Sequence, residues 1–284
     1  MKKLFWLSAC LMVLVGCAEQ EAAAPAEIAA TPEATEPAAQ ANGPDAYYEY
    51  LWCKQGPEYS QEAIASLVTD WNAIMDASEN SVTAAFGYRP KGWETEDYDG
   101  LLVLRLNNKA EMEAGWASYV STGAGEAFDA KYDPVLLCGD EVGVNRFGFD
   151  AYIPRGMPET FTGEPSPYFL TNSFCSFNEG MGPENLREVV GGTYIPAVDA
   201  AVEQNPGSSY WFMVGAPDFE VAADNAFDFN FVNYWQTAEE GQASSAGFAE
   251  SEQGQATMAA MNAVATCQEP QPWDGYVIRQ GNAS

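Results

Sequence analysis

Histidine is absent from the 284 residues of this chain. Its absence excludes Ser-His-Asp and Cys-His catalysis, zinc sites built on imidazole, and haem held by a histidine. Positive charge is also scarce, with 12 Lys and Arg against 41 Asp and Glu and a formal net charge of −29. A field of this sign repels phosphate backbones and anionic lipid surfaces, so no nucleic-acid partner is expected. It is typical of a solvated acidic shell or of a surface that docks a basic protein partner.

The N-terminus has the features of a secretory signal. Lys2 and Lys3 precede an apolar stretch over residues 4–15, which is too short to cross a bilayer. Residues 14–17 have the sequence Leu-Val-Gly-Cys, which resembles the bacterial lipobox. The resemblance implies that residues 1–16 are removed and that Cys17 becomes a lipidated N-terminus, carrying palmitate or a similar acyl chain.

Such a lipid anchors a soluble body to a membrane without a transmembrane helix. Ala18, rather than Asp, follows the cysteine. By the same resemblance, this implies a cell-envelope location, at the outer membrane and facing the periplasm. Residues 17–44 are rich in Ala, Pro and Glu. We expect them to form a disordered tether, because they cannot bury enough apolar surface to offset the entropy of ordering.

The cysteines outside the signal mark an internal repeat. One copy runs over residues 53–138 and the other over residues 175–267, and their C-terminal ends align without a gap. Four cysteines in an oxidising compartment predict two disulfides, with three possible connectivities. The repeat selects Cys53–Cys138 and Cys175–Cys267, and the alternative is four buried free thiols.

Each copy predicts the order strand, helix, strand, strand, helix, strand. In the first copy, strands are predicted at residues 46–53, 82–88, 101–106 and 144–152, and helices at 60–78 and 109–121. In the second, strands are predicted at 168–177, 209–214, 227–235 and 275–280, and helices at 183–204, 238–248 and 257–266. Ser60 is the expected N-cap of the first helix, and Pro196 is expected to kink or split the helix that contains it. The two repeats are placed at residues 45–155 and 164–284.

This order is the ferredoxin-like, split-βαβ pattern of the α+β class. A sheet with helices on one face leaves its other face open, and two such sheets in one chain can face each other. The arrangement resembles the dimeric α/β-barrel superfamily, here as a fused pseudo-dimer. In that topology the first and fourth strands are antiparallel neighbours, which agrees with the proposed cysteine pairs. The resemblance implies relatives that include small monooxygenases and haem-degrading proteins.

Strand residues that point away from the helices would line a lumen shared by the two sheets. Aromatic and polar residues at these positions have the composition of a small-molecule pocket. The candidates are Tyr48, Tyr50, Trp52, Arg105, Asn172, Asp228 and Asn230. The alternatives are that the aromatic residues form a core and that the polar residues face solvent or an interface. A slip of one residue would exchange the two faces.

No catalytic set is assigned, and neither a metal site nor a cofactor is expected. The acidic run at residues 94–99 lacks the spacing and the glycine of an EF-hand. Glu49 is a candidate general acid or base, or else a residue at an exposed strand edge or a partner of Arg105.

Three functions are compatible with the sequence. The first is a membrane-anchored lipoprotein that binds a small molecule or acts as an accessory module without catalysis. The second is a monooxygenase-like enzyme of the α/β-barrel type, acting on a small aromatic or apolar substrate. The third is a structural lipoprotein that docks a partner. An aromatic-lined cavity would favour the first two, whereas a filled space between the sheets with an apolar patch elsewhere would favour the third.

Overall fold

A computed structural model describes residues 43–77, 82–223 and 226–280. The expected signal, Cys17 and the tether up to residue 42 lie outside these ranges, so their interpretation stays a prediction. No described helix combines the length and the apolar character that a bilayer crossing requires.

The first half has the predicted order of elements, with two additions. Its elements are β1 (Ala46–Gln55), α1 (Gln61–Ala77), β2 (Ala84–Pro90), β3 (Gly100–Leu106), α2 (Lys109–Ser121), α3 (Ala124–Tyr132), β4 (Leu136–Cys138) and β5 (Arg146–Tyr152). Ser60 caps α1 as predicted, because its hydroxyl accepts a hydrogen bond from the Ala63 backbone N–H at 3.1 Å. The sequence does not predict α3 or the short β4.

The second half repeats this order. Its elements are β6 (Tyr168–Phe177), α4 (Pro183–Val189), the π-helical segment η1 (Val190–Tyr194), α5 (Ile195–Gln204), β7 (Trp211–Pro217), β8 (Phe229–Trp235), α6 (Ala238–Glu250), α7 (Glu252–Val264), β9 (Ala265–Cys267) and β10 (Gln271–Gln280). The predicted break at Pro196 takes the form of η1, since proline lacks the N–H that a regular helix would use there.

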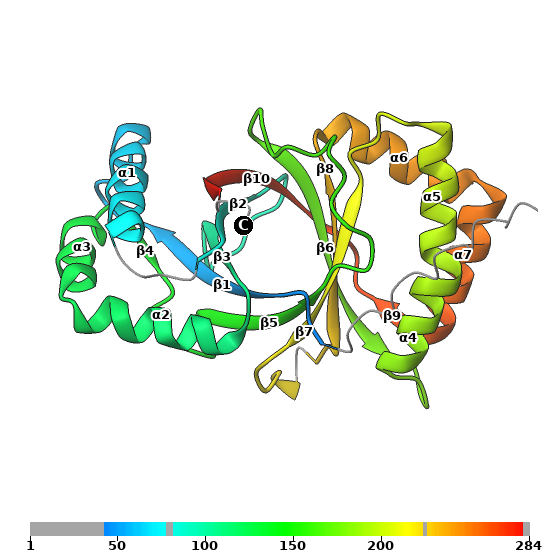
Figure 1. The fold of residues 1–284 in the computed structure, drawn as a ribbon, viewed down its shortest axis with the longest axis horizontal. Helices are drawn as coiled ribbons and strands as arrows, with labels where there is room; N and C mark the ends of the chain where they lie inside the picture. The colour runs from blue at the N-terminus through cyan, green and yellow to red at the C-terminus, as the bar shows by residue number, and fades with distance from the viewer. Residues whose placement is uncertain (1–42, 78–81, 224–225, 281–284) are drawn as a thin grey trace, which may run out of the picture. The chain divides into compact units, whose positions relative to one another are not determined.

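The strands close into an antiparallel barrel (Figure 1). Their order is β10-β2-β3-β1-β5-β7-β8-β6, and β6 pairs in turn with β10. Within each half the order is that of the split-βαβ pattern: β5-β1-β3-β2 and β10-β6-β8-β7. Pairing of β5 with β7 and of β10 with β2 joins the halves and leaves no open edge in the barrel. The predicted α+β class is thereby confirmed, and the two repeats form one closed barrel of eight strands.

Two disulfides cross-link the strand ends. Cys53 of β1 faces Cys138 of β4, and Cys175 of β6 faces Cys267 of β9. Each pair is bonded, and the bonds join residues that are 85 and 92 positions apart in the sequence. The predicted pairing is therefore confirmed.

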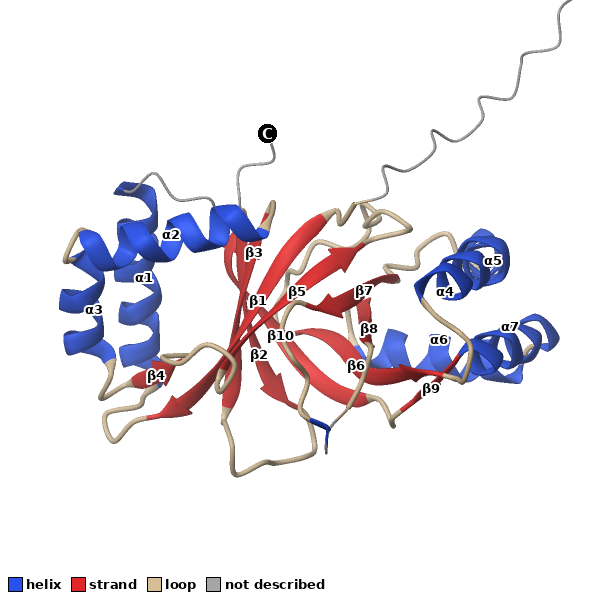
Figure 2. Cartoon of the chain, turned by 90° about the horizontal axis from the view of Figure 1, so that it is seen from below, coloured by secondary structure: helices blue, strands red, loops and turns tan. Residues whose placement is uncertain are grey.

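Side chains of each strand alternate between the barrel interior and the helices. On β1, Tyr48 and Tyr50 belong to the interior cluster, whereas Tyr47 and Leu51 pack on the side of the first half's helices. Helices α1, α2 and α3 lie on one outer side of the barrel, and α4 to α7 lie on the opposite side (Figures 1 and 2). Three buried clusters result, one inside the barrel and one under each group of helices.

Candidate functional site

The barrel interior is filled with aromatic side chains. Trp211 stacks on Tyr234 with ring centroids 4.0 Å apart. Phe161, from the segment that joins the halves, packs edge-on against Tyr168 and Trp211 at 5.3 and 5.6 Å. Burial raises the pKa of Tyr168 and of Tyr234 well above the ordinary value, so both hydroxyls stay protonated. The interior is a packed aromatic core.

Four of the predicted site residues lie in or beside this core. Tyr48 and Tyr50 are 3% and 7% exposed within it. Arg105 is the register partner of Tyr48 and donates from Nη1 to the Thr83 hydroxyl at 3.0 Å. Trp52 lies at the end of β1, with its ring 5.0 Å from Tyr98 and 5.1 Å from Phe147.

Of the three remaining candidates, Asn172 lies in β6, Asn230 lies in β8 and Asp228 directly precedes β8. Asn230 is 1% exposed, and the side-chain carbonyls of Asn172 and Asn230 are buried without a hydrogen-bond partner among the described residues. Buried polar atoms of this kind are normally paired with ordered water. Asp228 is exposed and accepts a hydrogen bond from the Phe177 backbone at 2.7 Å. The structure therefore does not bring Asp228 together with the others.

A cavity of about 1380 Å³ lies on the outer face of the first half's sheet, beneath α1, α2 and α3. Small-molecule pockets typically have volumes of about 300–1,000 Å³. The cavity lining is mainly apolar and includes Leu51, Leu104 and Leu106 from the sheet, Trp71 and Met75 from α1, and Met112 from α2. Val120 and Leu137, which are 74% and 45% exposed, also line it, so part of its apolar lining is open to solvent.

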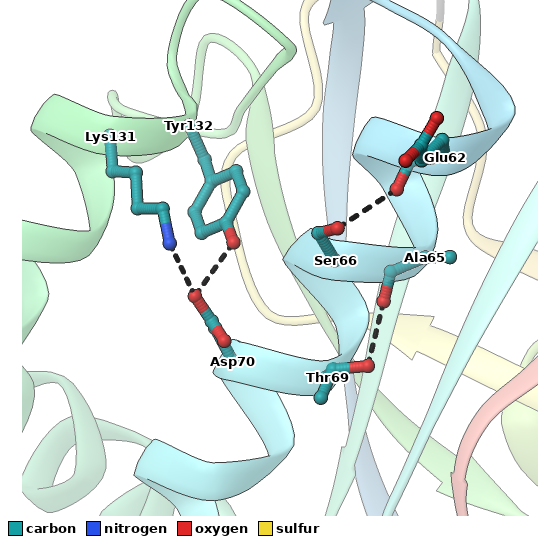
Figure 3. A network of polar contacts seen from close by, with 7 residues as sticks. All are labelled: Glu62, Ala65, Ser66, Thr69, Asp70, Lys131 and Tyr132. Carbon is teal, nitrogen blue, oxygen red and sulfur yellow. Dashed lines mark hydrogen bonds and ion pairs between the residues drawn. The ribbon is translucent and has the colours of Figure 1, made fainter.

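Polar contacts hold α1 at its middle and near its C-terminus, beside the cavity. Asp70 of α1 accepts hydrogen bonds from Lys131 and Tyr132 of α3, both at 2.7 Å (Figure 3). Near its C-terminus, Asn72 donates to the backbone carbonyl of Ile278 at 3.1 Å, and Asp76 pairs with Arg279 at 2.8 Å. The apolar stripe of α1 therefore faces the cavity.

The same position in the second half is filled. The ring of Tyr194 lies 5.0 Å from Phe212 and 5.4 Å from Phe231, so helix and sheet are in direct contact. Val190 and Val198 belong to the same buried cluster as these rings. The two halves share a topology, but in the first half the buried cluster of helix and sheet residues leaves a cavity beside it.

The cavity has one buried polar group, formed by Glu49, Trp116 and Arg146. Trp116 donates its indole N–H to Glu49 Oε2 at 2.6 Å, and Arg146 Nε lies 3.2 Å from Oε1. The Arg146 guanidinium also lies over the Trp116 ring, 4.4 Å from its centre. Glu49 is 3% exposed. Burial raises its pKa, against the opposing effects of Trp116 and Arg146.

These contacts correct two sequence-based interpretations of Glu49. It does not lie at a strand edge, because β1 is paired on both sides, with β3 and β5. It does not pair with Arg105, because Arg105 is opposite Tyr48 and points to the other face of the sheet. No sequence signal singles out Arg146 or Trp116; their role follows from β5 and α2 converging on Glu49.

The cavity lining supplies neither a histidine nor a free cysteine thiolate to haem, a cofactor that the fold resemblance suggests, and two of its tyrosines are already engaged. Haem iron is usually held by histidine, by a cysteine thiolate or by a tyrosine oxygen. The chain has no histidine, and the cysteines of its described part are in disulfides. Tyr119 and Tyr132 of the lining donate their hydroxyls to Asp129 and Asp70. Burial, reinforced by Asp129, raises the pKa of Tyr119, whereas a tyrosine ligand to iron must lose its proton.

The comparisons with known proteins found similar solved structures of low sequence identity to this chain. No family model matches the chain, and no curated protein matches it. A mutant chlorite dismutase from Candidatus Nitrospira defluvii in complex with cyanide is 8% identical with a TM-score of 0.47, over 83% of this chain and 92% of that one. A heme-binding protein from Thermus thermophilus is 8% identical with a TM-score of 0.44, over 82% and 91%. An anthrone oxidase-like protein is 12% identical with a TM-score of 0.45, over 84% and 97%. Identities this low assign no activity to this chain.

Proposed function

We propose that this chain is a membrane-anchored lipoprotein of the cell envelope that binds a mainly apolar small molecule without changing it chemically. The observation that carries the proposal is the cavity beneath α1, α2 and α3, with its volume of about 1380 Å³ and its apolar lining. A folded protein normally fills such a space, because each unfilled volume forfeits packing energy. A bound ligand restores those contacts.

The expected lipid on Cys17 supports the same proposal. A tether over residues 17–44 would hold the cavity within reach of a membrane, where apolar molecules concentrate. The exposed side chains of Val120 and Leu137 at the cavity lining favour passage of an apolar molecule over a charged one.

One observation favours an enzyme as the second candidate. Glu49 is a buried carboxyl group with a raised pKa in a cavity, which is typical of a general acid or base. Both of its oxygens are already engaged, by Trp116 and by Arg146, which favours a structural role for the group. Turnover separates the two candidates, since a binding protein returns the extracted molecule unchanged.

Native mass spectrometry of residues 18–284, produced in a bacterial periplasm, tests the proposal. We expect a mass excess that is lost on denaturation and a mainly apolar molecule in the organic extract. If the protein is isolated empty, titration with the neutral fluorophore Nile red should give saturable binding at one site. Absence of both the retained mass and saturable Nile red binding would contradict the proposed function.

A further inference from the structure

The polar group in the cavity, formed by Glu49, Trp116 and Arg146, has unused hydrogen-bond donors. Glu49 receives Trp116 Nε1 on one oxygen and faces Arg146 Nε with the other. A guanidinium carries five N–H donors. The Nε of Arg146 is buried without an aligned hydrogen bond, and its terminal nitrogens have no hydrogen-bond partner among the described residues. The unsatisfied hydrogen-bonding capacity at this end of the cavity therefore includes the terminal N–H donors of Arg146.

The orientation of the donor is fixed by its neighbours. Arg146 is the register partner of Leu51, so it extends from the outer face of the sheet, where it lines the cavity. The Trp116 ring against the guanidinium and the Glu49 carboxylate beside Nε hold its plane. The Arg146 side chain is 17% exposed, so a ligand oxygen can reach its terminal nitrogens.

The charge of the cavity selects against an ionic ligand. Its charged lining residues are Glu49, Arg89, Asp99, Asp129, Asp133, Asp140 and Arg146. Acids outnumber bases, so an anion would be repelled even though Arg146 offers donors. The carboxylates of Glu49, Asp99, Asp129 and Asp140 already accept hydrogen bonds, and Asp133 is exposed, which leaves a cation without a free, buried partner in this set.

On the basis of the proposed function, we infer that the ligand is an uncharged, mainly apolar molecule with a carbonyl-type oxygen that accepts a hydrogen bond from Arg146. Ketones, quinones, esters and lactones with an apolar body belong to this class. The apolar body would fill the space between α1 and the sheet, and the oxygen would meet the terminal nitrogens of Arg146. Arg146 is then a specificity-determining residue.

Displacement of Nile red by four ten-carbon probes tests this inference: 2-decanone, decane, decanoate and decylammonium. We expect 2-decanone to bind about tenfold or more tightly than decane, the size expected for a hydrogen bond from a charged donor. It should also bind more tightly than either ion. A preference for decanoate or decylammonium, or equal affinities for 2-decanone and decane, would overturn the inference.

Two variants assign the preference to Arg146. The double variant Glu49→Gln/Arg146→Met removes both charges together and avoids leaving one buried charge unpaired. In it, binding of decane should persist while the preference for 2-decanone disappears. Arg146→Lys keeps the charge without the planar donors and should reduce the preference. Retention of the full preference in the double variant would overturn the assignment.

If no probe binds the wild-type protein, the proposed function itself fails. If decane binds the wild-type protein and 2-decanone binds no more tightly, only this inference fails.

Discussion

The indole N–H of Trp116 donates to Glu49 at 2.6 Å, so that α2 covers an acidic side chain of the central strand β1. The Arg146 guanidinium lies against both residues. Burial raises the pKa of Glu49 even though both neighbours favour its charged form, so the cost of desolvation exceeds the gain from pairing. The ionised form of Glu49 is therefore disfavoured by its position in the lining of the mainly apolar cavity.

Glu49→Gln is predicted to change how stability depends on pH. A carboxyl group whose pKa is raised by folding contributes stability below the unfolded pKa of about 4.3, and this contribution is lost as pH rises through the folded pKa. The free energy of unfolding of the wild type should therefore fall relative to that of Glu49→Gln as pH rises above about 4. Each tenfold difference in proton affinity between the two states corresponds to about 1.4 kcal/mol.

Urea unfolding of both proteins across this pH range measures the difference. The other carboxyl groups titrate alike in both proteins, so their contributions cancel in the difference between the two free energies of unfolding. A wild type that gains stability relative to Glu49→Gln as pH rises would show that pairing with Arg146 dominates instead.

Gly115→Leu is predicted to fill part of the cavity without destabilising the fold. Gly115 lies in α2 and lines the cavity, and a Cβ built on it meets no atom within 4 Å. Leucine also has a higher helix propensity than glycine, by about 0.5–1 kcal/mol. Nile red affinity should fall several-fold, while the free energy of unfolding stays equal or rises.

The matched control is Gly247→Leu in α6, an exposed helical glycine of the second half that also has open space around it. It should gain similar helix stability and leave Nile red binding unchanged. Equal effects of the two substitutions on binding would place the apolar site elsewhere.

The order of elements is predictable because its signals are local. Alternation in residues 227–233 puts three phenylalanines on one face; Phe229 and Phe231 do pack under the helices, whereas Phe227, which precedes β8, packs against the barrel interior. Spacing alone also predicts the apolar stripe of α1. The paired cysteines add a long-range constraint, and the structure confirms both bonds.

The cavity is not predictable from the sequence, because the same stripe would suit a helix packed against the sheet. The position of α1 depends on contacts between distant residues: Asp70 with Lys131, 61 positions apart, and Asn72 with Ile278, 206 positions apart. The partner of Glu49 cannot be predicted from the sequence for a similar reason. Its neighbour in sequence, Tyr48, faces the opposite side of the sheet, so a partner for Glu49 cannot be chosen without the register of β1 and β5.

The double variant Cys53→Ser/Cys138→Ser is predicted to lose about 2–4 kcal/mol in free energy of unfolding. The bond closes a loop with a sequence separation of 85, and its removal frees the unfolded chain. It also releases the three-residue β4, which pairs with β1 beside the cavity. Urea unfolding without reductant measures the loss, and a change below about 0.5 kcal/mol would contradict the prediction.

Gly148→Ala is predicted to destabilise the protein by about 1–3 kcal/mol, because β5 leaves no room for a side chain at this position. A Cβ at Gly148 would lie 1.7 Å from the hydroxyl oxygen of Tyr47. That hydroxyl donates to Asp218 at 2.9 Å, and Asp218 also pairs with Lys109 at 2.8 Å, so the contact ties α2 and β1 to the end of β7. Urea unfolding should show the loss for Gly148→Ala and almost none for Gly156→Ala, an exposed glycine with open space around it. Equal stability of the two variants would mean that Tyr47 moves aside freely, and that its bridge between the halves contributes little to the fold.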